Sequence, residues 1–431
     1  MGDEQRYDLI IIGAGIGGVV CLHYARLAGL NVLLLEKQAC VGGLWAGLPA
    51  WQDIQINMND WTLGDLPIGG TDQASILANI RAWVDRFDLA SSIRLNTPVI
   101  QAQANATGWN VTTPERSYQC EFLVAATGAH NRPLIPQIER AHASLREFHS
   151  SALHDPAVLG GRDVVVVGGG ASAYDLLDLC FEHAARRVTW VYRTLKWMVP
   201  TRKPKRIAGD LRGLSRQQML GVSVEQMNAE FNRDLRSRYE KFGLLDILPQ
   251  GDFDLSRDQM IPGRRAMIEN FSRIDRHRGE ITRIDGNTVH LSTGTRIDAD
   301  LVLWGTGYAI DQSYFEAPAL AGATNIAALA ARCGSLFRSL DAPKLFLLAP
   351  ALLETTSTSP WAYAHASRTI VSHIRGRATL GVLPVLPKLN YFELPMFLAA
   401  HDAENYPPAT WFSDYRELAL NHPDDAPLPI P

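Results

Sequence analysis

The sequence predicts an α/β protein with two units, each organised around a parallel β-sheet. Two segments about 155 residues apart follow one plan: a buried strand, a glycine-rich turn, a helix and a second strand. Two further apolar strands, at 122–128 and 301–307, each run into a Thr-Gly turn after a hairpin-like region. Strands that alternate with helices predict parallel sheets. A chain of 431 residues is long enough for two domains.

The first segment starts at residue 7. Residues 7–12 (YDLIII) form a largely apolar and β-branched run, which predicts a strand buried on both faces. Residues 19–28 follow as a helix with Gly29 at its end, and residues 31–35 (NVLLL) form the second strand. This strand–turn–helix–strand order is typical of a nucleotide-binding unit.

Three glycines in the first turn, together with an acid after the second strand, predict a dinucleotide site. Gly13, Gly15 and Gly18 match G-x-G-x-x-G, in which they allow a tight turn, backbone approach to a pyrophosphate and close helix packing. The carboxylate of Glu36, at the end of the second strand, can accept hydrogen bonds from both ribose hydroxyls. We therefore expect a dinucleotide with a free 2′-hydroxyl here; a purely structural turn is the alternative.

The second segment repeats the plan with a different charge at the same place. Residues 163–167 and 188–192 predict strands on either side of a helix at 174–185. The turn between them, residues 168–173, reads GGGASA.

Basic residues after this second unit predict a phosphorylated cofactor. Gly168, Gly170 and Ala173 match G-x-G-x-x-A, and Ser172 lies where a helix start contacts a pyrophosphate. Arg193 follows the last strand and Lys196 comes soon after. Because arginine pairs bidentately with phosphate, we expect NADPH at this site. The alternative is that Arg193 is a solvated surface arginine.

Composition excludes several other classes of protein. Lys and Arg number 41 against 45 Asp and Glu, and no basic tract stands out, so we expect no nucleic-acid partner. The five cysteines lie at least 19 residues apart, which excludes a CxxC redox centre and a cysteine-based metal site. Residues 9–22 hold four glycines, follow acidic residues and lack a small-residue cleavage pattern, so we expect no signal peptide, and they are too short to span a bilayer. We therefore expect a cytoplasmic protein without metal.

Five short motifs identify a family resemblance. They are residues 42–45 (GGLW), 126–128 (ATG) with Pro133 and Pro136, 149–151 (HSS), 170–173 (GASA) and 304–308 (WGTGY). Together they resemble class B flavin-dependent monooxygenases, the family of flavin-containing and N-hydroxylating monooxygenases. The similarity covers most of residues 5–310 and continues more weakly to about residue 375.

The resemblance implies a domain order in which an NADPH-binding domain is inserted into an FAD-binding domain. Residues 1–155 are then the first FAD-binding segment, 156–295 the NADPH-binding domain, and 296–431 the second FAD-binding segment with a C-terminal tail. A charged helical segment at about 203–265 belongs to the NADPH-binding domain. Its apolar positions, Val224, Met227, Phe231 and Leu235, predict a helix packed on that domain, with a substrate lid as the alternative.

Several residues acquire roles through the resemblance. Gly43, Trp45 and Thr127 are expected to bind FAD. Thr306, in the second Thr-Gly turn, is also expected to bind a cofactor. Either Asn57 or Asn59 is expected beside the flavin, because a side-chain amide donates without titrating. A turn role is the alternative.

Three more residues take roles near the cofactors. His149 and Ser150 contact the nicotinamide cofactor or order the interdomain hinge, and Arg132 contacts a cofactor phosphate or is merely exposed. A helix at 360–365 is expected to point towards the flavin, with core packing as the alternative for Trp361.

The family's activity sets the expected reaction. NADPH reduces FAD, and the reduced flavin adds O₂ to give a C4a-(hydro)peroxyflavin that oxygenates a small-molecule substrate. The full F-x-G-x-x-x-H fingerprint is incomplete around His149, since Ala143 and Leu145 occupy its Phe and Gly positions. Oxygenation of nitrogen or sulfur is therefore favoured. The alternatives are Baeyer–Villiger oxygenation of a ketone and an FAD/NAD(P)H oxidoreductase without oxygenation. The sequence leaves the oligomeric state open between a monomer and a homodimer.

Overall fold

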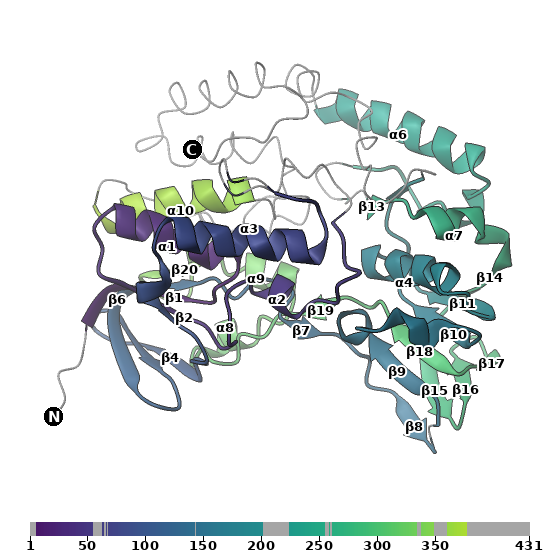
Figure 1. Ribbon diagram of the computed structural model, residues 1–431, viewed down its shortest axis with the longest axis horizontal. Helices are drawn as coiled ribbons and strands as arrows, with labels where there is room; N and C mark the ends of the chain where they lie inside the picture. Colours follow the sequence, from purple (N-terminus) through teal and green to yellow (C-terminus); the bar gives the residue numbers. More distant parts are fainter. Residues whose placement is uncertain are drawn as a thin grey trace.

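The computed structural model of the chain describes residues 6–54, 63, 66, 68–142, 144–200, 224–254, 258, 261–333, 338–348 and 360–376. They form two units that lie side by side, each with a central sheet (Figure 1). Within these ranges, no helix is both long and apolar enough to cross a membrane.

The first unit contains a seven-stranded sheet in the order β3-β2-β1-β6-β5-β4, with β20 paired to β6. Strands β3, β2, β1, β6 and β20 are parallel, whereas β5 and β4 continue from β6 as an antiparallel meander. The strands are β1 (Arg6–Ile12), β2 (Val32–Leu35), β3 (Ile93–Arg94), β4 (Gln101–Ala104), β5 (Trp109–Thr112), β6 (Ser117–Ala125) and β20 (Leu345–Leu347).

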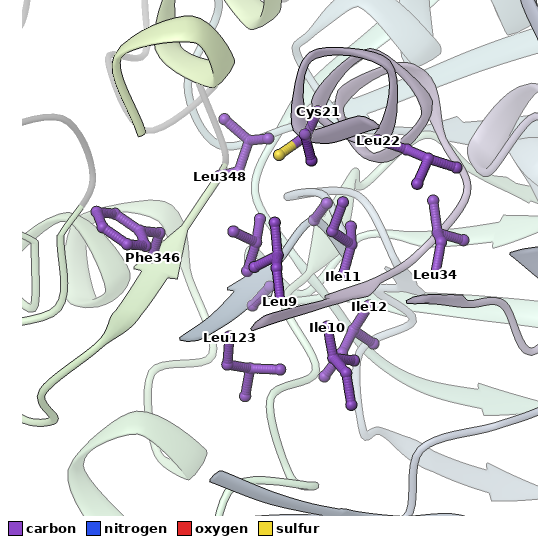
Figure 2. Close-up of a cluster of buried hydrophobic side chains, with 14 of the residues drawn as sticks. Leu9, Ile10, Ile11, Ile12, Cys21, Leu22, Leu34, Leu123, Phe346 and Leu348 are labelled. Atoms are coloured by element: carbon purple, nitrogen blue, oxygen red, sulfur yellow. The ribbon is translucent and has the colours of Figure 1, made fainter. Parts of the chain in front are cut away.

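The core of this unit explains the unbroken apolar run of β1. Side chains from both faces of β1 are buried, with Cys21 and Leu22 of α1 (Ile16–Leu27) on one side and Ile10 and Ile12 pointing to the other (Figure 2). Helix α10 (Pro360–Ile374) packs on α1. The remaining helices are α2 (Leu44–Gly47), α3 (Gln73–Arg86), α8 (Pro318–Ala321) and α9 (Ile326–Ala330).

The second unit is built on a fully parallel sheet in the order β14-β11-β10-β18-β9. Its strands are β9 (Arg146–His149), β10 (Asp163–Val167), β11 (Arg187–Tyr192), β14 (Ile274–Arg278) and β18 (Leu301–Trp304). Its helices are α4 (Ala171–Glu182), α6 (Val224–Lys241) and α7 (Arg265–Glu269). Phe231 and Leu235 of α6 are buried in its core, so the packed-helix prediction is confirmed for these two residues. The side chains of Val224 and Met227 lie outside the described part.

Among the described residues, three small sheets accompany the two central ones. A four-stranded sheet, β17-β16-β15-β8, joins β8 (Glu139–Ala141) to β15 (Ile281–Asp285), β16 (Thr288–Leu291) and β17 (Arg296–Asp298). The expected hairpin turns at Gly286, where φ is +60°. The other two sheets pair β12 (Met198–Val199) with β13 (Ile261–Pro262), and β7 (Arg132–Pro133) with β19 (Tyr308–Ala309).

The α/β class and the insertion of one unit into the other are confirmed, because β20 and α10 return to the first unit after the second is complete. The predicted domain boundaries at residues 155 and 295 stay a prediction, and the second sheet includes one strand beyond each of them. Strand β9 precedes the first boundary and β18 follows the second, yet they are neighbours in the second sheet, with Leu301 opposite Arg146. The two connecting segments run antiparallel as β7 and β19, between the units (Figure 1).

Candidate dinucleotide-binding sites

The first glycine-rich turn excludes side chains by close backbone contacts. Gly13 has a φ of +101°, and a Cβ there would lie 2.7 Å from the Ala126 carbonyl oxygen. A Cβ on Gly18 would lie 1.8 Å from the Gly13 carbonyl oxygen. These contacts hold the start of α1 against the ends of β1 and β6, so the backbone N–H groups of the first helical turn lie at the carboxyl edge of the sheet.

A second loop closes on this turn. A Cβ on Gly43 would lie 2.8 Å from the Gly15 Cα, and the Gly42 N–H donates to the Ala14 carbonyl at 2.9 Å. The GGLW segment and the glycine-rich turn therefore form one cradle, in which two backbones meet without intervening side chains. Trp45 lies in α2, where its carbonyl accepts a hydrogen bond from the Gln73 side chain.

Glu36 ties this cradle together. It is only 4% exposed, and its Oε2 accepts the Ala14 N–H at 2.6 Å while Oε1 accepts the Gln38 N–H at 2.8 Å. A carboxylate has about four acceptor positions, so these two bonds leave capacity for a ribose hydroxyl. The link from Glu36 to the turn backbone was not predicted from the sequence.

The first Thr-Gly turn borders the same cradle. A Cβ on Gly13 would lie 3.4 Å from the Thr127 Cα, and the Thr127 hydroxyl accepts a hydrogen bond from the buried Gln312 amide at 3.3 Å. Arg132 lies further along, exposed on β7 opposite Ala309. Asn57 and Asn59 lie outside the described residues, and so does the side chain of Trp361.

The second glycine-rich turn is built by contact with the second Thr-Gly turn. A Cβ on Gly168, whose φ is +130°, would lie 2.2 Å from the Gly305 carbonyl oxygen. A Cβ on Gly305 would lie 2.7 Å from the Ala173 Cα. Because Gly305 has no side chain, the second turn has room for Ala173 at the position that Gly18 holds in the first turn.

The approach to this turn is open where a pyrophosphate would lie. A Cβ on Gly170 would meet a single neighbour within 4 Å, the Lys196 Cγ at 3.9 Å. Ser172 lies, partly buried, in the first turn of α4. The Lys196 N–H donates to the Gly169 carbonyl at 2.8 Å, which fixes the segment after β11 beside the turn.

Arg193 stands at the predicted place but with an unpredicted partner. Its side chain is 74% exposed, and its Nη1 lies 2.8 Å from the Oε1 of Glu280. Lys196 is exposed as well. The structure therefore brings two cations to the edge of the second glycine-rich turn and adds one carboxylate that no sequence motif marked.

His149 links the two strands that neighbour each other in the second sheet. It is 3% exposed; its Nε2–H donates to the Gly307 carbonyl at 2.9 Å, and Nδ1 faces the Ser151 hydroxyl at 2.8 Å. Because a carbonyl only accepts, the Nε2–H tautomer is required. Burial lowers the pKa of His149 below its usual value, which favours the neutral ring at neutral pH. Both nitrogens contact protein atoms, which favours the hinge interpretation.

The residues around His149 also make their contacts with other protein atoms. Ser150 is completely buried, so this arrangement does not support a direct contact with a bound cofactor. Tyr308 packs edge-on against His149, with ring centroids 5.0 Å apart, and burial raises the pKa of its hydroxyl. Thr306 donates its hydroxyl to the Leu134 carbonyl. These contacts join the ends of β9 and β18 to the segment that leads back to the first unit.

Curated relatives align with only part of their own length. The chain is 28% identical over 268 residues to an FAD-binding monooxygenase of Byssochlamys spectabilis, covering 57% of this chain and 44% of that protein. It is 28% identical over 213 residues to a phenazine N-monooxygenase of Lysobacter antibioticus, covering 46% and 39%. The chain thus spans about half the length of the curated relatives it matches.

Solved structures share the fold over most of the chain. A complex of OTEMO with FAD and NADP superposes with a TM-score of 0.65 at 18% identity, covering 86% of this chain and 85% of that one. A flavin-containing monooxygenase from Stenotrophomonas maltophilia superposes with a TM-score of 0.62 at 17% identity, covering 86% and 99%. The family of pyridine nucleotide-disulphide oxidoreductases matches residues 10–241. That match includes both glycine-rich turns and more than half of the chain, and the chain therefore belongs to the pyridine nucleotide-disulphide oxidoreductase family.

Proposed function

We propose that this protein is an FAD- and NADPH-dependent monooxygenase that oxygenates a nitrogen or sulfur atom of a small molecule. The observation that carries the proposal is the pair of glycine cradles with opposite partners, Glu36 at the first and Arg193 at the second. The similarity to an FAD-binding monooxygenase and to a phenazine N-monooxygenase supports the same activity. The complex of OTEMO with FAD and NADP supports the pair of cofactors.

The first cradle fits FAD. The backbone contacts among Gly13, Gly15, Gly18 and Gly43 leave no side chain between the two loops, which suits a pyrophosphate. Glu36 would hold the adenosine ribose through its remaining acceptor capacity, and Thr127 borders the cradle. We keep Asn57 and Asn59 as the proposed amide donors beside the flavin.

The second cradle fits NADPH. Gly168, Gly170 and Ala173 shape the turn, and Ser172 with the first turn of α4 would bind the pyrophosphate. Arg193 and Lys196 would bind the 2′-phosphate. FAD held in the first cradle would supply the redox chemistry that couples oxidation of the nicotinamide to reduction of O₂. Overall, substrate, O₂, NADPH and a proton give oxygenated substrate, NADP⁺ and water.

His149 is proposed as a positioning residue. Its hydrogen bond to the Gly307 carbonyl ties the end of β9 to the segment after β18, and its contact with Ser151 fixes the ring, at the place where both segments leave the second sheet towards the first unit. Hydride transfer depends on the distance between two bound cofactors, so such a contact would affect the rate without touching the reacting atoms.

Dithiol chemistry, the activity in the family's name, is not supported. All five cysteines are free thiols. Burial raises the pKa of Cys21 and Cys120 to about 12, and it raises the pKa of Cys180 and Cys333 still further. A redox dithiol requires an accessible thiolate near neutral pH. Baeyer–Villiger oxygenation and NADPH oxidation without oxygenation remain the alternative activities. We also propose a cytoplasmic location.

A coupling measurement tests the function. The purified protein, loaded with FAD, is supplied with NADPH and air, and NADPH, O₂ and H₂O₂ are followed with panels of amines, sulfides and ketones. We expect an amine or sulfide to suppress H₂O₂ release and to yield one oxygenated product per NADPH. Oxygenation of ketones alone would favour the Baeyer–Villiger alternative, and H₂O₂ release unaffected by every compound would favour an oxidase.

A further inference from the structure

The cation expected to recognise the 2′-phosphate is already held by a carboxylate. The Nη1 of Arg193 lies 2.8 Å from the Oε1 of Glu280, and the two side chains are 74% and 54% exposed. Arg193 follows β11 and Glu280 follows β14, and these two strands are parallel neighbours in the second sheet. The ion pair therefore lies at the carboxyl edge of the sheet, beside the second glycine-rich turn.

Backbone contacts fix the position of Glu280. Tyr192 of β11 is opposite Arg278 of β14, and the Gly279 N–H donates to the Tyr192 carbonyl at 2.9 Å. Glu280 donates its N–H to the Ser292 hydroxyl at 3.1 Å, and its carbonyl accepts the Ser292 N–H at 2.8 Å. The carboxylate is thus carried on a backbone held from two sides, within reach of Arg193.

We propose that Glu280 is a specificity-determining residue for the nicotinamide cofactor, an inference that rests on the proposed function. Its carboxylate forms an ion pair with the Arg193 guanidinium while no nucleotide is bound. A 2′-phosphate, which carries about −1.5 to −2 charge, must displace that carboxylate and then remain close to it. A 2′-hydroxyl faces no such repulsion and can instead donate a hydrogen bond to the carboxylate. Glu280 therefore narrows the preference for NADPH over NADH.

The expected effect follows from the exposure of the pair. Exposed ion pairs typically change an equilibrium by about two- to fivefold, and removal of the repulsion adds to that effect. Glu280→Gln should therefore tighten NADP⁺ binding by about two- to tenfold and leave NAD⁺ binding unchanged or weaker. Because both charges are exposed, the gain should shrink as salt is raised from about 0.05 M to 0.5 M.

Equilibrium titration of the FAD-loaded protein with NADP⁺ and with NAD⁺, by calorimetry at two salt concentrations, tests this inference. The matched control is Glu121→Gln, which removes one carboxylate from an ion pair with Lys344 in the other unit, 2.8 Å long. We expect the control to bind both nucleotides as the unaltered protein does.

Two results would overturn the inference. If Glu280→Gln weakens NADP⁺ binding as strongly as Arg193→Ala does, Glu280 orients the arginine and does not compete with the phosphate. If the ratio of the two dissociation constants equals that of the Glu121→Gln control, Glu280 has no part in specificity. Failure of the unaltered protein to bind either nucleotide is a separate result, because it refutes the proposed function as well.

Discussion

The buried carboxylate of Glu36 makes two contributions that one substitution can separate. Each of its oxygens accepts one backbone N–H, from Ala14 at 2.6 Å and from Gln38 at 2.8 Å. A glutamine in its place has one carbonyl oxygen and one NH₂ group, so its NH₂ faces either the buried N–H of Ala14 or the part-buried N–H of Gln38. Glu36→Gln should therefore lower the free energy of unfolding by about 1–3 kcal/mol, the cost of one unsatisfied buried donor.

The same substitution should weaken FAD binding, because the NH₂ group replaces an oxygen that would accept a hydrogen bond from the ribose. Loss of a hydrogen bond to a charged group costs about 1.5–3 kcal/mol, roughly a 10- to 150-fold change in the dissociation constant. Urea unfolding of the FAD-free protein measures the first effect, and FAD titration of the same preparation measures the second. Glu121→Gln again serves as the control for loss of an exposed carboxylate.

The outcomes of these two measurements separate the two roles. Reduced stability with unaltered FAD affinity would show that Glu36 only braces the turn, and the proposed ribose contact would be refuted. Unaltered stability and unaltered affinity would refute the account of the whole cradle.

Three further substitutions test other parts of the account. Arg193→Ala should weaken NADP⁺ binding by roughly 10- to 150-fold, the effect of a charged hydrogen bond, and should change NAD⁺ binding by less than about twofold; equal losses in calorimetry would contradict the 2′-phosphate assignment. Burial lowers the pKa of His149, so its neutral form stabilises the fold above pH ~6.5, and that contribution is lost as the pH falls through the lowered pKa. His149→Gln should reduce the pH dependence of urea unfolding between pH 5 and 7 by up to about 1.4 kcal/mol per pH unit, while the parts due to His23 and His130, whose pKa values burial also lowers, remain; an unchanged profile would contradict this. Arg264 and Asp175 form a buried ion pair of 2.5 Å, with side chains 3% and 8% exposed, so Arg264→Met should cost about 3–5 kcal/mol in thermal or urea unfolding; a loss below about 1 kcal/mol would show that the charge is not needed there.

The elements that depend on local pattern were predictable from the sequence. The apolar run of β1 reflects burial on both of its faces, and the glycines that follow it reflect the close contact of Gly18 with Gly13. Both features depend on residues that are close together in the sequence. Glu36 was predictable for the same reason, because it ends a strand next to a recognisable turn. The expected geometry at Gly168 and Gly170 follows from the same motif.

Contacts between distant segments were not predictable in this way. The pairing of β9 with β18 joins residues about 155 apart, and it adds to the second sheet two strands that lie outside the 156–295 boundaries implied by the family resemblance. Glu280 belongs to no motif, and only the register of β14 against β11 places it beside Arg193. The fit of Ala173 against Gly305 likewise depends on two turns that meet in space. Arg193 and Glu280 could have been paired from the sequence only if β11 and β14 had been known to be neighbours in the sheet.

The fate of molecular oxygen tests the proposed monooxygenase most directly. The FAD-loaded protein is supplied with NADPH, ¹⁸O₂ and the amine or sulfide that best suppresses H₂O₂ release, and the product is analysed by mass spectrometry. The account predicts one ¹⁸O atom in each product molecule and one NADPH consumed for each product formed. Product without ¹⁸O, or ¹⁸O recovered only as H₂O₂ with every compound, would contradict it.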